Sequence, residues 1–148
     1  METIMKHHDL EVWRQSVLFT VLVYGITDCF PARERYGLAR QIRNSAISIP
    51  SNVAEGASRT SPREFRGFIS NALASVSELE TLLEVAKRLG FIDDDPALLL
   101  VPLCRIRMML IKLRQALDKK HSRDQAVSTH SWLAPHKNPY LCSIKTTP

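Results

Sequence analysis

Apolar residues recur at helical spacing in four stretches of the chain, with short polar segments between them. The third stretch places them alternately four and three positions apart, at Phe65, Ile69, Ala72, Val76, Leu79, Leu83 and Ala86. The fourth repeats this spacing at Leu99, Leu103, Ile106, Leu110, Leu113 and Leu117. Such heptad patterns are typical of helices in left-handed bundles. We predict an all-α fold, an antiparallel up-down-up-down four-helix bundle over residues 9–120. Its helices are predicted at about 10–30, 34–54, 62–89 and 96–120.

The first stretch carries more apolar residues than one core-facing side requires. One row consists of Trp13, Val17, Val21 and Tyr24, and a second of Leu18, Leu22 and Ile26, with Phe19 and Val23 beside it. A helix in a monomeric bundle needs only one apolar side. The second row favours a homo-oligomer whose interface includes Leu18, Phe19, Leu22 and Ile26. The alternative is a wide core-facing side in a monomer.

Local signals predict where the helices start. Asp9 is the expected N-cap of the first helix. Before the third helix, Ser61 is the expected N-cap, Pro62 takes the first helical position, and Glu64 completes a capping box. Asp95-Pro96 is expected to cap the fourth helix.

Prolines and glycines predict interruptions and ends. Pro50 removes a backbone donor and clashes with the preceding turn, which predicts a kink or a break near 46–50. Gly56 is expected to end the second helix, and Gly90 followed by Phe91 suits a C-terminal cap. Pro102 predicts that the regular part of the fourth helix begins only there.

Composition fits one soluble domain. The 148 residues are 45% apolar and carry a net charge of +5, which permits binding to nucleic acid or to an acidic partner but equally describes an ordinary surface. Cys29, Cys104 and Cys142 form no CxxC pair, as expected of reduced thiols in a cytoplasmic protein, and the first two are expected in the core. We expect no signal peptide and no membrane span. Residues 1–8 and 121–148 are predicted to be flexible.

Arginines concentrate between residues 33 and 66. The candidate nucleic-acid-binding residues are Arg33, Arg35, Arg40, Arg43, Arg59, Arg63 and Arg66. Three glutamates oppose them, so the stretch carries +4, and guanidinium groups suit phosphate oxygens. Surface ion pairing is the alternative. Residues 105–123 form a second basic patch, with seven basic residues against Asp118. Neither patch is expected to stack on the bases of single strands.

Polar residues gather where the second helix is expected to end. Asn52, Glu55, Gly56 and Arg59 could form a binding corner. The alternative is turn chemistry, in which Asn52 and Glu55 satisfy free backbone groups and Arg59 pairs with Glu55.

Several segments together resemble a known family. LEVWRQSV at 10–17, FPARERYGLARQIRNSAISIPSNVAEG at 30–56 and SPREFRGFISNALASVSELETLL at 61–83 are similar to the four-helix-bundle family of 23S rRNA-intervening sequence proteins. The resemblance covers roughly residues 9–118. Similar bundles include accessory proteins of diversity-generating retroelements, which are basic homopentamers that bind nucleic acid and a reverse transcriptase. No enzymatic activity is established for the family.

The resemblance implies a non-enzymatic, homo-oligomeric protein, with a pentamer favoured, that offers a basic surface to structured RNA or DNA or to a nucleoprotein. A scaffold that binds only protein is the alternative. No cofactor or metal is expected, because a di-iron bundle needs Glu-x-x-His pairs and the histidines all lie in the predicted termini.

One enzymatic alternative remains. Arg114 and His121 fit an R-x6-H spacing that resembles the motif of HEPN-type endoribonucleases. In that reading His121 acts as acid or base on a ribose hydroxyl, and Arg114 holds a phosphate.

Overall fold

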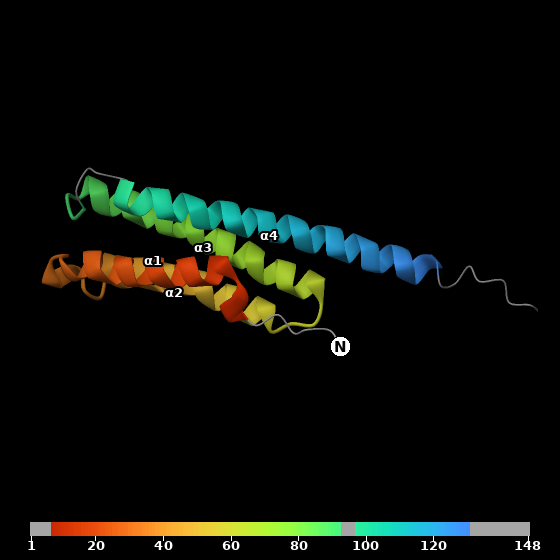
Figure 1. Ribbon diagram of the computed structural model, residues 1–148. Helices are drawn as coiled ribbons and strands as arrows, with labels where there is room; N and C mark the ends of the chain where they lie inside the picture. Colours follow the sequence, from red (N-terminus) through yellow and green to blue (C-terminus); the bar gives the residue numbers. More distant parts are fainter. Residues whose placement is uncertain (1–6, 93–96, 131–148) are drawn as a thin grey trace, which may run out of the picture.

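The chain folds into four α-helices, the class predicted from the sequence. The computed structural model describes residues 7–92 and 97–130, and within the last helix it describes the side chains of 98–125. The helices are α1 (Glu11–Asp28), α2 (Leu38–Ala57), α3 (Pro62–Arg88) and α4 (Ala97–His130), with short 3-10 helices η1 (His7–Asp9) before α1 and η2 (Ala32–Glu34) before α2 (Figure 1). No strand occurs in the described ranges.

Consecutive helices run in opposite directions. Thr20 on α1 contacts Ala46 on α2, whereas Asp28, eight residues further along α1, contacts Arg43, which comes earlier on α2. Figure 1 shows the same reversal at the two following connections. The α2–α3 seam is the most closely packed, and the α1–α4 seam is the loosest. One side of the bundle is therefore open compared with the other.

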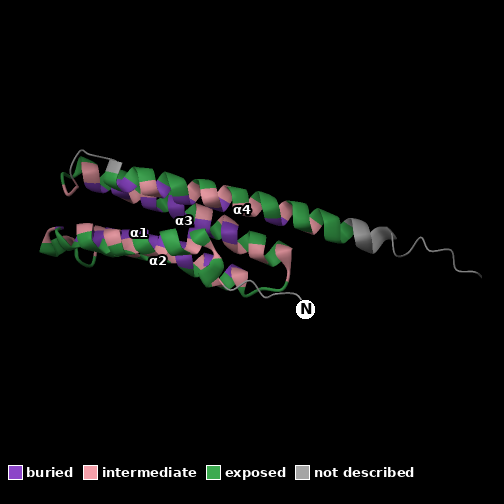
Figure 2. Cartoon of the chain, viewed as in Figure 1, coloured by how far each residue is buried: buried purple, intermediate pink, exposed green. Residues whose placement is uncertain are grey.

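The predicted heptad residues form the core. Every member of the α3 row from Ile69 to Ala86 is buried, and Phe65 is half-buried. On α4, Leu113 is half-buried and the rest of the row is buried, at Leu99, Leu103, Ile106, Leu110 and Leu117. Figure 2 shows the buried residues along the facing sides of the helices. Burial of each such Leu or Ile side chain contributes about 1.5–3 kcal/mol to the stability of the fold.

The core side of α1 differs from both predicted rows. Its buried residues are Val12, Ser16, Phe19, Val23 and Thr27. Ser16 Oγ donates to the Val12 carbonyl at 2.7 Å, and Thr27 Oγ1 donates to the Val23 carbonyl at 2.8 Å. Because these hydroxyls are satisfied within their own helix, they can be buried at little cost. Val21 and Tyr24, from the first predicted row, are exposed.

Pro50 does not interrupt α2, which continues from Leu38 to Ala57. The break expected from the sequence is therefore absent. Pro50 leaves the Ala46 carbonyl, four residues earlier, without its usual N–H donor. Thr20 Oγ1 of α1 shares its one proton between that carbonyl, at 3.1 Å, and the carbonyl of Ser16, at 2.8 Å. A neighbouring helix thus supplies the donor that proline lacks.

The helix starts follow the sequence signals only in part. The N-cap of α1 is Leu10 rather than Asp9, which belongs to η1. Ser61 has the extended backbone of an N-cap before Pro62, but its hydroxyl makes no capping hydrogen bond, so the predicted capping box with Glu64 is absent. The predicted cap at Asp95 lies outside the described residues.

The helix ends are clearer. Gly90 has φ of +73°, and the N–H groups of Gly90 and Phe91 donate to the carbonyls of Lys87 and Ala86, both at 2.9 Å. This is the predicted glycine cap, in the Schellman arrangement.

Helix α4 starts close to its predicted bound of about 96, but it is regular before Pro102 and longer than predicted at its C-terminal end. It begins at Ala97, ahead of Pro102, and extends to His130. Residues 121–130, predicted as the start of a flexible tail, are helical, and residues 131–148 lie outside the described residues.

Candidate nucleic-acid interface

The structure divides the seven candidate arginines into two groups at opposite ends of the bundle. One group lies at the start of α2, at Arg33, Arg35, Arg40 and Arg43. The other lies around the α2–α3 turn, at Arg59, Arg63 and Arg66. Even the nearest two in sequence, Arg43 and Arg59, are 16 positions apart along α2 and its end, a length of about 24 Å. The arginines therefore do not form the single track that their closeness in sequence suggested.

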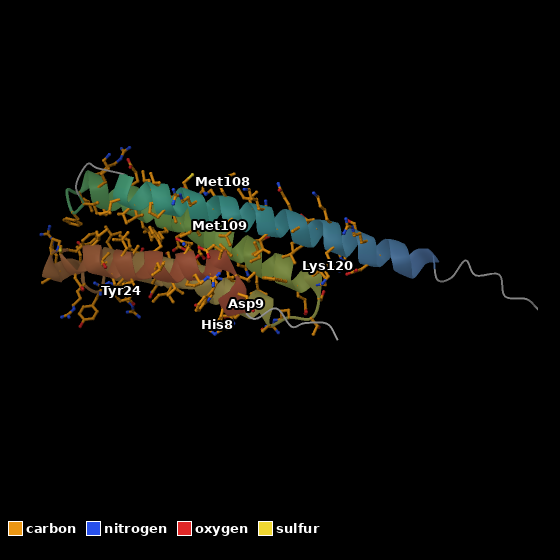
Figure 3. The ribbon with its side chains drawn as sticks, viewed as in Figure 1. His8, Asp9, Tyr24, Met108, Met109 and Lys120 are labelled. Atoms are coloured by element: carbon orange, nitrogen blue, oxygen red, sulfur yellow. The ribbon has the colours of Figure 1, made fainter. Side chains whose placement is uncertain are left out.

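Arg43 is held in place at the α1–α2 end. Its Nε donates to Thr27 Oγ1 at 2.7 Å, and its Nη2 lies 2.7 Å from Asp28 Oδ1. The guanidinium carbon lies 4.7 Å from the centre of the Tyr24 ring, which projects outward from α1 (Figure 3). Only 19% of the Arg43 side chain is exposed. Arg43 thus joins α1 to α2, as the ion-pairing alternative expected of it.

The other arginines of this end face solvent. Arg33 Nε lies 4.0 Å from Glu34 Oε1, a weak surface pair. Arg35 and Arg40 are exposed and have no carboxylate partner among the described residues. Arg35 and Arg43 also line a small hollow of about 220 Å³ between η2 and the ends of α1 and α2.

At the α2–α3 end, one arginine joins two helices. Arg66 on α3 pairs with Asp118 on α4. Arg63 lies one turn earlier on the same side of α3 and is exposed, without a described carboxylate partner. The guanidinium carbon of Arg59 lies 5.0 Å from the centre of the Phe68 ring rather than beside Glu55.

The contact between Arg66 and Asp118 brings the second basic patch to this end. Lys119 and Lys120 follow Asp118 directly and are exposed, as is Arg123. We call the resulting surface the basic end: Arg59, Arg63, Arg66, Arg114, Lys119, Lys120 and Arg123. The same segments contain four acidic residues, so basic residues outnumber acidic ones at this end. The acidic residues are Glu55, Glu64, Asp118 and Asp124. Beyond Leu117, α4 projects past the α2–α3 turn (Figure 1). Arg107, by contrast, lies mid-bundle and pairs with Glu80 at 2.6 Å.

An aromatic residue that the sequence reasoning overlooked lies among the arginines of the α1–α2 end. Tyr36 stands between Arg35 and Arg40 in the sequence and is 80% exposed. The expectation that neither patch stacks on the bases of single strands overlooked this aromatic residue in the first patch. The segment RERYGLAR at 33–40 already indicated this feature, because it places an aromatic residue between basic residues just before a helix.

The motif corner has a structural role. Asn52 Nδ2 donates to the Ser48 carbonyl at 2.8 Å and lies 3.1 Å from Ser48 Oγ, which in turn lies 2.9 Å from Ser75 Oγ on α3. Glu55 is exposed and has no described ion-pair partner. Gly56 is buried as the second-last residue of α2, which ends at Ala57. A Cβ at Gly56 would lie 2.4 Å from Phe65 Cδ2. These contacts favour a role in α2–α3 packing over a binding corner.

The proposed oligomer residues on α1 differ in exposure. Leu18 is 64% exposed, whereas Leu22 and Ile26 are half-buried against the core. Phe19 is buried, with 3% exposed, because it points into the bundle. Phe19 is therefore unavailable as a contact for a second copy, and the neighbouring Val21, 67% exposed, lies on the outer surface instead.

A groove opens along the loose α1–α4 seam. It measures about 580 Å³, and Figure 3 shows Met108 and Met109 on the α4 side of it. Its lining residues are Glu11, Gln15, Val101, Cys104, Arg105, Met108, Met109 and Lys112. A hydrogen bond from Gln15, with the charge of Arg14, holds the pKa of Glu11 below its usual value. Cys104 and Cys29, expected in the core, are exposed because they lie on outward-facing positions of α4 and at the end of α1.

The residues of the enzymatic alternative share one helix. Arg114 and His121 are both half-buried on α4, and they are seven positions apart, so they lie two turns apart on one side. His121 Nε2 lies 3.1 Å from Gln125 Nε2. His121 is thus within the helix, whereas the sequence had placed it at the start of the tail.

Other chemistries find little support in the described ranges. No three His, Cys, Asp or Glu side chains gather there in a way that could hold a metal ion. None of the helices, over the residues that the structure describes, has the length and apolarity needed to cross a membrane.

The comparisons agree with the fold. A search of curated proteins finds no match. Residues 8–112, which include α1 to α3 and the first half of α4, match the family described as 23S rRNA-intervening sequence protein. The match covers most of the chain, and the four-helix fold is the one expected from the motifs. The chain belongs to the 23S rRNA-intervening sequence protein family.

Proposed function

We propose that this protein is a non-enzymatic, cytoplasmic homo-oligomer that binds structured RNA or DNA, alone or within a nucleoprotein, through its basic end. The observation that carries the proposal is the meeting of two basic segments far apart in sequence. The ion pair between Arg66 and Asp118 places the start of α3 against the C-terminal half of α4.

The basic end offers cations on rigid elements. Arg63, Lys119 and Lys120 are exposed and have no described carboxylate partner, so they can contact phosphates without first breaking an ion pair. Release of counterions from a nucleic-acid backbone then drives binding. No Phe, Tyr or Trp side chain described at this end is fully exposed, since Trp13, Phe65 and Phe68 are half-buried. Charge without stacking favours the backbone of a paired stem over unpaired bases.

Self-association is supported by the outer surface of α1. No charged residue occurs from Gln15 to Thr27, although Leu18 and Val21 face solvent. Val101 and Met108 of α4 are also exposed beside the groove. Contiguous apolar surface of this kind marks an interaction site. We infer that a second copy covers it, and the family resemblance favours a pentamer.

The binding proposal is tested by fluorescence anisotropy with a labelled hairpin that has a fully paired stem, in RNA and DNA versions. Wild-type affinity should fall steeply as salt increases. The variant Lys119→Ala/Lys120→Ala should weaken binding and lower the log–log salt slope by up to about 1.8, because each lost phosphate contact removes about 0.9. The matched control is Arg14→Ala/Arg88→Ala, which removes the same charge from arginines already paired with Glu11 and Glu84.

Two results would reject the binding proposal. One is binding that is undetectable or insensitive to salt. The other is an equal effect of the test and control variants, which would mean that only net charge matters. A silent test variant together with a stable oligomer would favour the scaffold that binds only protein.

Self-association is tested separately by light scattering after size exclusion. Leu18→Glu places a charge on the exposed apolar surface without touching the core, and it should reduce the molar mass. Lys119→Ala/Lys120→Ala should leave the mass unchanged. A wild-type monomer would reject the oligomer.

A further inference from the structure

Tyr36 is the most exposed large apolar side chain among the described residues, at 80%. It lies between η2 and α2, immediately before Gly37, the N-cap of α2. No described ring or guanidinium group packs against it. Its ring is therefore accessible for stacking.

Cations surround this ring along the chain. Arg35 precedes it directly, Arg33 lies three residues before it, and Arg40 lies four residues after it. All three are exposed, and only Arg33 has a weak carboxylate contact, with Glu34. We call Arg33, Arg35, Tyr36 and Arg40 the arginine–tyrosine corner. An aromatic ring flanked by cations matches a nucleotide, which has a flat base and a charged phosphate.

The backbone of the corner is fixed. Glu34 Oε2 accepts a hydrogen bond from the Leu38 N–H at 3.2 Å, and the Glu34 carbonyl accepts one from the Gly37 N–H at 3.0 Å. Arg43 joins the adjoining turn of α2 to Thr27 and Asp28 of α1. A ring presented on a rigid turn loses little freedom when a ligand stacks on it, which favours binding.

The immediate neighbours of Tyr36 separate a nucleic acid from a protein ligand. A protein-binding centre is apolar and surrounded by a polar rim. Here the residues from Arg33 to Arg40 include three arginines and one glutamate, and the one large apolar residue besides Tyr36, Leu38, is half-buried against the core. The chemistry therefore fits an anionic ligand with a flat ring.

We propose that the arginine–tyrosine corner binds single-stranded nucleic acid or the unpaired loop of a structured one. A base stacks on the Tyr36 ring, and Arg35 and Arg40 contact the flanking phosphates. The site lies at the opposite end of the bundle from the basic end, so it extends the proposed function but does not depend on it.

The test is fluorescence anisotropy with labelled oligouridine and oligothymidine, which have no paired stem. Tyr36→Ala should weaken binding about tenfold or more, since loss of base stacking on an aromatic ring has an effect of that order. Tyr36→Phe keeps the ring and should bind like the wild type. Arg35→Ala/Arg40→Ala should lower the salt slope by up to about 1.4, at about 0.7 per phosphate of a single strand.

Two controls separate this site from the rest of the protein. Arg88→Ala removes a cation at the same end of the bundle, one paired with Glu84, and should change little. Tyr36→Ala should leave binding to a blunt-ended duplex, which has no unpaired loop, unchanged. Circular dichroism should show an intact fold for every variant, because the altered side chains are exposed.

The outcomes are distinct. The proposal is supported if Tyr36→Ala loses binding to either polymer while Tyr36→Phe keeps it. This holds even if the protein does not bind the paired hairpin. An unaffected Tyr36→Ala variant, an equal loss in Tyr36→Phe, or no binding of either polymer by the wild type overturns it. Loss in Lys119→Ala/Lys120→Ala with a silent Tyr36→Ala would place the strand at the basic end and also overturn it.

Discussion

Gly56 provides the sharpest test of the packing between α2 and α3. An alanine Cβ at this position would lie 2.4 Å from Phe65 Cδ2, 2.9 Å from Phe65 Cε2 and 2.9 Å from Phe68 Cβ. Ordinary contacts of this kind are 3.4–4 Å, so the Phe65 ring would have to move by about 1 Å. Phe68 Cβ is attached directly to the backbone, and it can move only if α3 moves. Gly56→Ala should therefore push the two helices apart.

The magnitude follows from two opposing effects. Overpacking of this kind costs about 1–3 kcal/mol. Alanine gains up to about 1 kcal/mol over glycine inside a helix, but Gly56 is the second-last residue of α2, where the gain is smaller. We expect a net loss of about 1–2 kcal/mol of unfolding free energy. Gly67→Ala is the matched control, since Gly67 lies inside α3 with no atom within 4 Å of its Cβ position. It should stabilise the fold by about 0.5–1 kcal/mol.

Urea unfolding followed by circular dichroism measures both effects at one protein concentration, because self-association also affects stability. With a urea dependence of about 1–3 kcal/mol per molar, the midpoints should shift in opposite directions by some tenths of a molar or more. If Gly56→Ala were as stable as the wild type, or if both variants shifted in the same direction, the close approach of α2 and α3 at Gly56 would be wrong.

Three further predictions concern other parts of the bundle. Thr20→Val should cost about 1–3 kcal/mol of unfolding free energy, because it leaves the Ala46 carbonyl unpaired. The cost should be much less in a Pro50→Ala background, where the N–H of residue 50 can bond that carbonyl. A double-mutant cycle measured by urea unfolding tests this, and an absence of coupling between the two substitutions would contradict it. Cys104 should react with a thiol reagent more slowly in the oligomer than in a Leu18→Glu monomer, while Cys29 stays equally reactive in the two. Mass spectrometry of labelled peptides distinguishes the two cysteines. Equal protection of Cys104 and Cys29 in the oligomer would argue against coverage of the groove. His121→Ala should leave binding of the paired hairpin unchanged, and a gel assay should show no RNA cleavage by the wild type; cleavage lost in His121→Ala would instead support the endoribonuclease alternative.

The helices with regular apolar spacing were the predictable part of the fold. In α3 and α4 the sustained four-three spacing identifies the core, although apolar residues such as Leu98, Val101 and Met108 also occur between the heptad positions and are exposed. In α1 this contrast is missing, and nearly every residue from Val17 to Ile26 is apolar. The buried side includes Ser16 and Thr27, whose hydroxyls bond carbonyls of their own helix and can therefore be buried at little cost. Hydropathy treats such residues as outward-facing, so the side of α1 could not be predicted from it.

The candidate interface was harder to predict because helices separate sequence neighbours. Arg40 and Arg59 belong to one dense stretch of sequence, yet α2 places them at opposite ends of the bundle. Arg66 and Asp118 are 52 residues apart, yet they are in contact. For Tyr36 the sequence showed an aromatic residue flanked by arginines, and the structure added that its side chain is exposed.

The distribution of charge suggests how self-association and nucleic-acid binding can coexist in one small bundle. Residues 15–27 of α1, 44–54 of α2 and 67–77 of α3 contain no charged side chain. These three segments lie side by side at the same level along the bundle axis, because Thr20 contacts Ala46 and Ser48 contacts Ser75. The basic end and the arginine–tyrosine corner lie on either side of this uncharged middle. Copies that pack through the middle of α1 bury no charge of that helix. The charged groove residues Glu11, Arg105 and Lys112 would lie at the rim of such a contact, because burying an unpaired charge opposes association. Such packing leaves both ends of every copy in solvent. Substitutions at the ends should therefore alter nucleic-acid binding without altering the molar mass. Leu18→Glu should lower the molar mass, while each separate copy keeps its contacts with nucleic acid.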